Sequence, residues 1–197
     1  MRVILPSIER PKKLPVVLGH NEVRQLLKAP KLLKHRLVLA MLYGCGLRSF
    51  ELCNLQLKDL DLERKMLHVR QGKGRKDRYV PLCAMQVRGL RKYISAESPI
   101  TWCFNGNDSE GNPVALSTTG VRWIVREARK HSGIQKEVTT HSLRHSYATH
   151  LLEMGLDIIS VKDLLGHADI QTTLAYLHVA QLGRQRPFSP LERLYNY

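Results

Sequence analysis

The sequence predicts a mainly α-helical domain with a small antiparallel β-sheet, an α+β fold. Apolar residues recur every three to four positions through most of the chain after Asn21, as in helices that bury one face. Between residues 66 and 82 the period changes to two, which is typical of paired strands. With 197 residues, 43% of them hydrophobic, the chain can bury one substantial core.

The first part of the chain predicts an arm followed by helices. Residues 1–18 are basic and proline-rich without periodicity, so we interpret them as a linker or N-terminal arm ahead of a domain at residues 19–180. Helical spacing then predicts helices over residues 21–30, 32–43 and 50–55. Gly44 and Gly46 end the second of these helices.

The strand-like runs MLHVRQ and RYVPL flank the segment GKGRKD, which predicts a hairpin with a glycine-rich basic tip. Further helices are expected over residues 82–94, 118–131, 142–154, 157–165 and 170–179. Ser117, Thr140 and Asp169 are candidate N-caps, and Gly155 and Gly166 are candidate C-terminal stops. Residues 181–197 form a tail in which a last short helix is expected after two prolines.

The chain is strongly basic, with 31 Lys and Arg against 17 Asp and Glu and a formal net charge of +14 at pH 7. This excess favours a polyanionic partner, with nucleic acid ahead of an anionic membrane surface. No apolar stretch reaches the ~20 residues that span a bilayer, and Pro6, Pro11 and Pro15 interrupt any signal-peptide core. We therefore expect a soluble, cytoplasmic protein with no membrane partner.

The four cysteines are far apart in the sequence and form no Cys-x-x-Cys pair. We interpret Cys45, Cys53, Cys83 and Cys103 as reduced thiols, mostly in the core. A zinc site is the alternative, but the usual spacing of zinc ligands is missing.

Cleaving a phosphodiester without a metal requires a nucleophile, cations for the charge on the phosphate oxygens, and an acid for the leaving oxygen. Arg48 is a candidate cation, because in GCGLRSFEL it stands where one helix ends and the next begins. Its guanidinium can face outward beside free backbone N–H groups, an arrangement that suits a phosphate. The alternative is a surface arginine paired with Glu51 one turn on.

The segment HSLRHSYATH begins a predicted helix, and His141 and Arg144 lie three residues apart on one face of it. They could address the same phosphate, whereas His145 is expected to point elsewhere. One alternative is a capped, partly buried helix start with ordinary hydrogen bonds. A metal site using His141 and His145 is another, but the third ligand and the glutamate of the zincin pattern are absent.

The segment LLGHADIQTTLAYLHV places His167 on a turn and Tyr176 on the helix that follows. Tyr176 is a candidate nucleophile, although a tyrosine at helical spacing can equally be a core aromatic.

Lys73 lies at the tip of the predicted hairpin, where a long cation could enter a DNA groove and donate a proton to a leaving oxygen. The alternative is a solvated run of charges that binds the DNA backbone. That backbone role is the one expected of its neighbours Arg70, Arg75, Lys76 and Arg78.

These segments, in this order, resemble the tyrosine recombinase (phage integrase) family from about Pro15 to Val179. The resemblance implies that Arg48, Arg144 and His167 bind the scissile phosphate. It also implies a 3′-phosphotyrosyl intermediate and strand exchange that needs neither ATP nor a metal ion, with no cofactor. The expected substrate is double-stranded DNA, and a bacterial, phage or mobile-element origin is implied.

The resemblance also gives roles to the remaining candidate residues. Tyr176 would be the nucleophile, His141 would help to deprotonate it, and Lys73 would protonate the leaving 5′ oxygen. Protomers would assemble on DNA, as a tetrameric synapse. The tail at 181–197 would either pack on its own domain or, as the resemblance implies, be exchanged with a neighbouring protomer.

Two other functions remain open. Residues 157–179 could form a helix-turn-helix that binds DNA without catalysis, although the apolar side chains of its second helix are unsuited to reading bases. Relaxation of DNA in the manner of a type IB topoisomerase would use similar residues.

Overall fold

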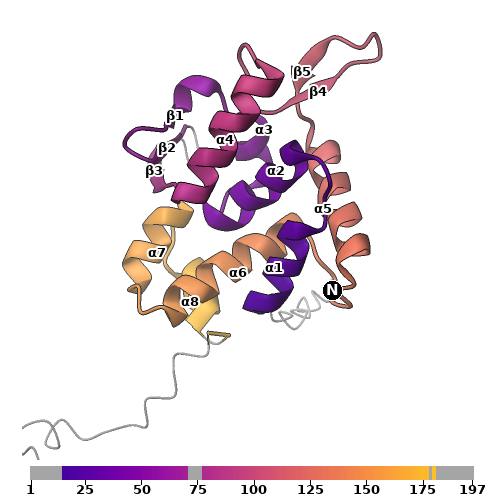
Figure 1. The fold of residues 1–197 in the computed structure, drawn as a ribbon. Coiled ribbons are helices and arrows are strands. Elements are labelled where there is room, and N and C mark those ends of the chain that lie inside the picture. The colour runs from indigo at the N-terminus through magenta and orange to yellow at the C-terminus, as the bar shows by residue number, and fades with distance from the viewer. Residues whose placement is uncertain (1–14, 71–76, 178, 181–197) are drawn as a thin grey trace, which may run out of the picture.

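The computed structural model describes residues 15–70, 77–177 and 179–180 (Figure 1). Within these residues the helices are α1 (His20–Lys28), α2 (Leu33–Gly44), α3 (Ser49–Cys53), a short 3-10 helix η1 (Leu57–Asp59), α4 (Ala84–Glu97), α5 (Thr118–Ser132), α6 (Thr140–Glu153), α7 (Ile158–Leu165) and α8 (Gln171–Leu177). The strands are β1 (Leu60–Asp61), β2 (Met66–Val69), β3 (Arg78–Pro81), β4 (Asn105–Asn107) and β5 (Pro113–Ala115). The predicted mainly helical fold with a small antiparallel sheet is confirmed.

Helix α6 crosses the middle of the molecule and packs against α2, α5, α7 and α8 (Figure 1). It is buried on nearly every side, and even Ser146 and Thr149 are 0% and 1% exposed. Small side chains such as Ser146, Ala148 and Thr149 contribute to this close packing, because they let neighbouring helices approach closely. Residues along α6 therefore reach both the large core cluster and a smaller cluster formed with α7 and α8.

The predicted hairpin is confirmed by the antiparallel pairing of β2 with β3, in which Leu67 lies opposite Val80. Both of these side chains are fully buried, so the sheet closes one side of the core. The hairpin tip at residues 71–76 lies outside the described residues. Strand β1 extends this sheet, and β4 pairs with β5 in a second sheet that sequence analysis missed, because its strands are three residues long without apolar alternation.

Three local expectations need correction. Leu18, assigned to the arm, is fully buried, and its N–H donates to the hydroxyl of Ser146 at 2.9 Å. The N-cap of α6 is Thr139 rather than Thr140, because the Thr139 hydroxyl accepts the Ser142 N–H at 3.2 Å. Helix α3 ends at Cys53, two residues early.

The cysteines are free, and Cys45, Cys53 and Cys103 are buried whereas Cys83 is exposed. Burial raises the pKa of Cys45 and of Cys103 to about 12, so these thiols stay protonated at neutral pH. Across the described parts of the chain, no helix combines the length and apolarity that crossing a membrane requires.

Gly46 holds a backbone position that another residue could not fill. Its φ of +58° lies in the left-handed region, and a Cβ added to it would lie 2.5 Å from the Tyr147 ring. The residue therefore needs both the conformational freedom and the small size of glycine.

Gly46→Ala should therefore lower the free energy of unfolding by roughly 2–5 kcal/mol, the sum of left-handed strain and overpacking. Gly133→Ala is the control, since Gly133 has a φ of +73° but no described atom within 4 Å of the added Cβ. It should lose only about 1–2 kcal/mol in urea unfolding. Equal losses in the two variants would show that the Tyr147 contact does not matter.

Candidate active site

The carboxylate of Glu51 on α3 lies at the centre of the site, with its side chain 3% exposed. Arg78 donates one hydrogen bond to each carboxylate oxygen, at 2.9 and 2.8 Å. Arg48 donates through Nη1 at 2.8 Å and through its backbone N–H at 2.9 Å. Nη1 of Arg144 lies 4.0 Å from the same carboxylate. Among the described residues, three guanidinium groups thus face one carboxylate, which leaves a net charge of +2.

Glu51 remains ionised in this cluster. Burial opposes its ionisation, but hydrogen bonds and charge from Arg78, with the Arg48 N–H and Arg144, hold the pKa of Glu51 below its usual value. Because one carboxylate cannot neutralise three guanidiniums, the cluster is suited to bind a further anion.

Arg144 connects three parts of the fold. It projects from α6, is 3% exposed, and donates to the backbone carbonyls of Gly46 and Leu165. Burial and the neighbouring charge of Arg48 lower the pKa of Arg144 to about 10, so the guanidinium stays charged at neutral pH. These contacts fix its guanidinium beside the other arginines.

Tyr176 on α8 is buried in the smaller core cluster, with 4% of its surface exposed. Its hydroxyl lies 3.0 Å from Nδ1 of His145 on α6. Burial raises the pKa of Tyr176, while the charges of Arg144 and Arg48 act to lower it. The tyrosine is therefore a phenol in this state, next to cations that would favour the phenolate.

Two histidines border this tyrosine. Burial lowers the pKa of His145, helped by the charges of His141 and Arg144. Nδ1 of His167 lies 2.9 Å from the Thr173 hydroxyl, and its pKa falls to about 4 through burial and the charge of Arg144. Both imidazoles are thus neutral at neutral pH, and each has one nitrogen that accepts a hydrogen bond and one N–H that donates one.

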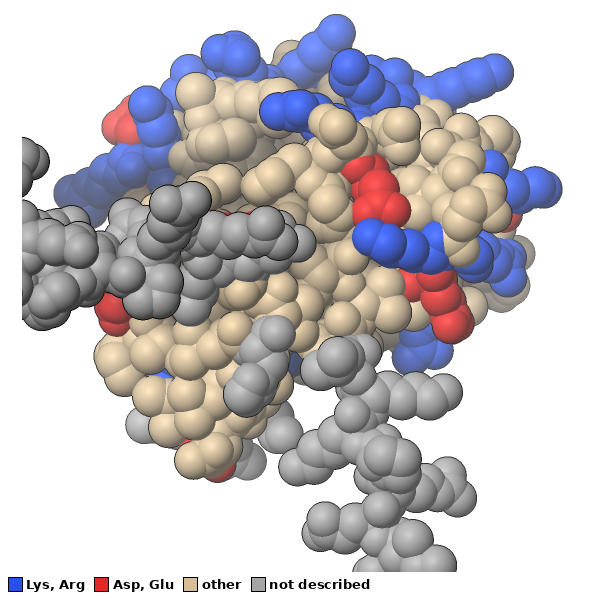
Figure 2. Space-filling model, turned by 90° about the horizontal axis from the view of Figure 1, so that it is seen from below, with Lys and Arg blue, Asp and Glu red and all other residues tan. Residues whose placement is uncertain are grey.

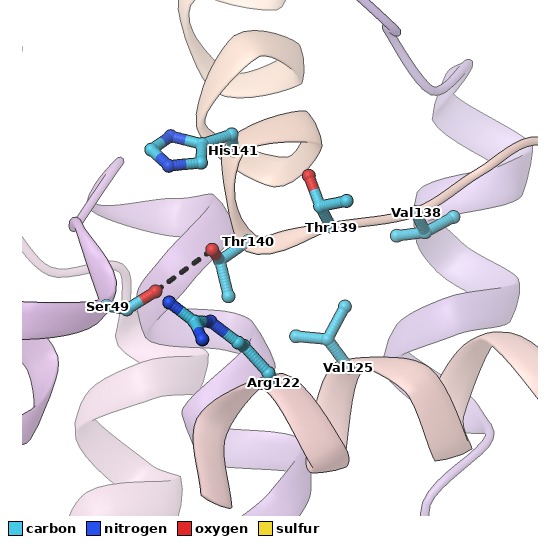
Figure 3. Close-up of a pocket in the computed structure, with 7 residues that line it drawn as sticks. All are labelled: Ser49, Arg122, Val125, Val138, Thr139, Thr140 and His141. Atoms are coloured by element: carbon cyan, nitrogen blue, oxygen red, sulfur yellow. Dashed lines mark hydrogen bonds between the residues drawn. The ribbon is translucent and has the colours of Figure 1, made fainter. Parts of the chain in front are cut away.

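His141 is exposed at the start of α6, and its ring centroid lies 6.3 Å from that of His145. It borders a pocket of about 360 Å³ that also contains Arg122 of α5. Figure 3 shows the Arg122 side chain directed towards Ser49 and Thr140, whose hydroxyls form a 2.9 Å hydrogen bond. Ser49 directly follows Arg48, so the pocket adjoins the arginine cluster.

The structure brings five of the six candidate residues into one region, namely Arg48, His141, Arg144, His167 and Tyr176. Lys73 lies outside the described residues. The surface pairing of Arg48 with Glu51, considered as an alternative, is present, but as part of a largely buried cluster.

Two residues behave differently from their predicted roles. His145 does not point elsewhere, because α6 is buried on nearly all sides and its neighbour α8 brings Tyr176 to it. Arg78 is not a solvated member of the basic run, since its side chain is 7% exposed and bound to Glu51. The alternation of residues along β3 could have predicted the burial of Arg78, because Arg78 and the buried Val80 share one face of that strand.

The non-catalytic helix-turn-helix interpretation is not supported by the packing of α8. This helix buries Thr173 and Tyr176, and it contacts α6 and α7 rather than presenting an independent recognition face.

Basic side chains are numerous on the face of the molecule that Figure 2 shows. Seen from below, Lys and Arg gather along the upper and right-hand edges of Figure 2, whereas the tan region at the lower left consists mostly of other residues.

The sequence matches the Phage integrase family over residues 16–182. It is 40% identical over 196 residues to a tyrosine recombinase of Thermosipho africanus, covering 98% of this chain and 66% of that protein. The crystal structure of XerA recombinase is similar, with a TM-score of 0.76, 32% identity, and coverage of 97% of this chain and 66% of that one. So is XerH recombinase bound to palindromic difH substrate, with a TM-score of 0.73, 27% identity, and coverage of 92% and 53%. The chain therefore spans at most about two thirds of each of these proteins.

Glu51→Gln should lower the free energy of unfolding by about 3–5 kcal/mol at pH 7, because it removes the anion of a buried ion cluster. The folded-state pKa of Glu51 is depressed from its usual 4.5, so its contribution is complete above that pH and is lost as the pH falls through the folded-state value.

The difference between wild type and Glu51→Gln should consequently shrink in urea unfolding below about pH 4.5. The exposed Glu63→Gln is the control and should change stability by less than about 0.5 kcal/mol. A Glu51→Gln protein as stable as wild type at pH 7 would contradict the central role of this carboxylate.

Proposed function

Since this chain belongs to the phage integrase family of tyrosine recombinases, we propose that it cuts and rejoins double-stranded DNA at specific sites. The observation that carries the proposal is the contact between the Tyr176 hydroxyl and His145, beside a cluster of arginines with excess positive charge. In this proposal the catalytic domain begins at Leu18, which is buried in the core, and runs to residue 180, and the residues before Leu18 are a linker. The protein would act in the cytoplasm, where the DNA is.

In the proposed reaction Tyr176 Oη attacks the scissile phosphorus, and the bond from phosphorus to the 5′ oxygen breaks. The phenol proton passes to a neutral histidine, and the departing 5′ oxygen takes a proton from Lys73. His145 is the histidine in contact with Tyr176, whereas the resemblance gives this role to His141. His141 can act through His145, because their rings are adjacent.

Arg48, Arg144 and His167 would bind the scissile phosphate. A bound phosphate would oppose the cationic repulsion that contributes to the low pKa of His167, so this histidine would become a better donor to the phosphate. The product is a 3′-phosphotyrosyl linkage. One phosphodiester replaces another, so a free 5′ hydroxyl can reverse the step or join a new strand without ATP.

Self-association on DNA, as a tetrameric synapse, is part of the proposal. The tail at residues 181–197 lies outside the described residues, and its Leu191 and Leu194 would share one apolar face. A groove of about 650 Å³ between α2, α4 and α6 offers an apolar receptor for the tail of a neighbouring protomer. Met85 and Met154 border this groove and are 62% and 71% exposed.

Tyr176→Phe should abolish the covalent protein–DNA adduct on a nicked suicide substrate, because it removes the nucleophilic oxygen while leaving the phosphate cluster intact. DNA affinity in a gel-shift assay should stay nearly unchanged. Tyr147→Phe and the exposed Tyr79→Phe are controls that should still form the adduct. An adduct that persists in Tyr176→Phe would disprove the assignment.

The pocket next to the arginine cluster is proposed to bind the DNA phosphate beside the scissile one. Arg122→Ala should weaken DNA binding similarly for all sequences and reduce the slope of log K against log salt by about 1, the loss of one phosphate contact. Arg64→Ala is the control, because the Arg64 side chain is 86% exposed and lies beside Asp61 rather than in the pocket. The same change of slope in both variants would mean that any surface arginine suffices and that the pocket has no special role.

A further inference from the structure

A second group of potential ligands lies away from the tyrosine. His20, His150 and Glu153 each offer one ring nitrogen or carboxylate oxygen, and these three atoms all lie within 4.8 Å of one another. His20 begins α1, whereas His150 and Glu153 occupy the last turn of α6. The candidate catalytic residues of α6 lie nearer its other end, so this cluster belongs to a different part of the molecule.

The residue types and their spacing suit a borderline metal ion. Two histidines and one carboxylate form a common ligand set for Zn²⁺, which takes a water as its fourth ligand at open sites. His150 and Glu153 are three residues apart and so share one helix face, and His20 closes the set from another element. The rings of His20 and His150 are already stacked, with centroids 4.0 Å apart.

A neighbouring residue orients the buried histidine. The Tyr43 hydroxyl lies 2.9 Å from Nδ1 of His150, which is 4% exposed. Histidines that bind metals typically use their second nitrogen in this way, which fixes the ring and leaves the first nitrogen for the ion.

The fold brings the two elements together independently of any ion. Leu18 is fully buried two residues before His20, and its N–H bonds to Ser146, one turn before His150 on α6. The start of α1 is therefore anchored against α6, and the metal ligands are held near one another in advance. The Leu18 backbone also forms a hydrogen bond with the His150 ring, a contact that a bound ion would replace.

We propose that His20, His150 and Glu153 bind one Zn²⁺ ion, with Nε2 of His150 as its ligand and Tyr43 positioning the ring. The ion ties the start of α1 to the last turn of α6. It stabilises the helix that carries the candidate active site and takes no part in the reaction of Tyr176. This proposal does not rest on the proposed function.

The test is calorimetric titration of the full chain with Zn²⁺, after removal of metal by a chelator, together with the visible spectrum of the Co²⁺ form. One ion per chain and a tetrahedral Co²⁺ spectrum are expected. At free Zn²⁺ about 100 times Kd, the Tm should rise by roughly 5–10 °C. Glu153→Gln and His20→Ala should each weaken Zn²⁺ binding at least tenfold. The His20 side chain is exposed, so its loss should not disturb the core. Tyr43→Phe should weaken Zn²⁺ binding by ~10–100-fold.

Matched controls separate this site from other places where zinc could bind. His131→Ala, an exposed histidine near the end of α5, and Cys83→Ser, an exposed thiol, should bind Zn²⁺ as wild type does. Tyr176→Phe should also keep full zinc binding, so the adduct assay and the zinc assay can fail separately. Wild type that binds no zinc, or variants at His20 and Glu153 that bind it normally, would overturn the proposal.

Discussion

The candidate active site depends on one buried carboxylate. Three guanidinium groups from separate parts of the chain could not pack together in a low-dielectric interior without an anion between them. Glu51 supplies that anion, and its hydrogen bonds fix Arg78 and Arg48 while Arg144 lies at the edge of the cluster. Among the described residues the cluster keeps an excess of positive charge, which an incoming anion such as the proposed DNA phosphate would neutralise.

Helix α6 connects the arginine cluster to Tyr176 and to the start of α1. Its burial on almost all sides places Arg144 and His145 at the arginine cluster and at Tyr176, while its last turn meets the start of α1. A side chain on such a helix has little freedom to choose another position, since interior packing is as dense as in an organic crystal. The helix therefore presents preorganised groups, which is the condition for stabilising charge that develops during a reaction.

Burial and nearby positive charge act in opposite directions on the pKa of Tyr176 but in the same direction on the pKa of the two histidines. Burial favours the neutral phenol of Tyr176 and the neutral rings of His145 and His167, and the arginines add to the effect on the two histidines. These are the charge states from which the proposed reaction starts, because a neutral histidine can take the phenol proton. In that proposal a bound phosphate would offset the cationic charge that contributes to the low pKa of His167.

The sequence by itself determined most of the helices, the hairpin and the list of candidate residues, because these rest on local signals, whereas it missed the short strands β4 and β5. Helical spacing, glycine stops and the alternation in the hairpin depend on neighbours a few positions apart, and the structure confirms the fold class that they predict. Only the tertiary structure decided that Arg78 joins Glu51, that His145 meets Tyr176, and that His20 meets His150. These pairs lie from 27 to 130 positions apart in the sequence. No local periodicity reports which faces of distant helices and strands will pack together, since that choice depends on the packing of the whole core.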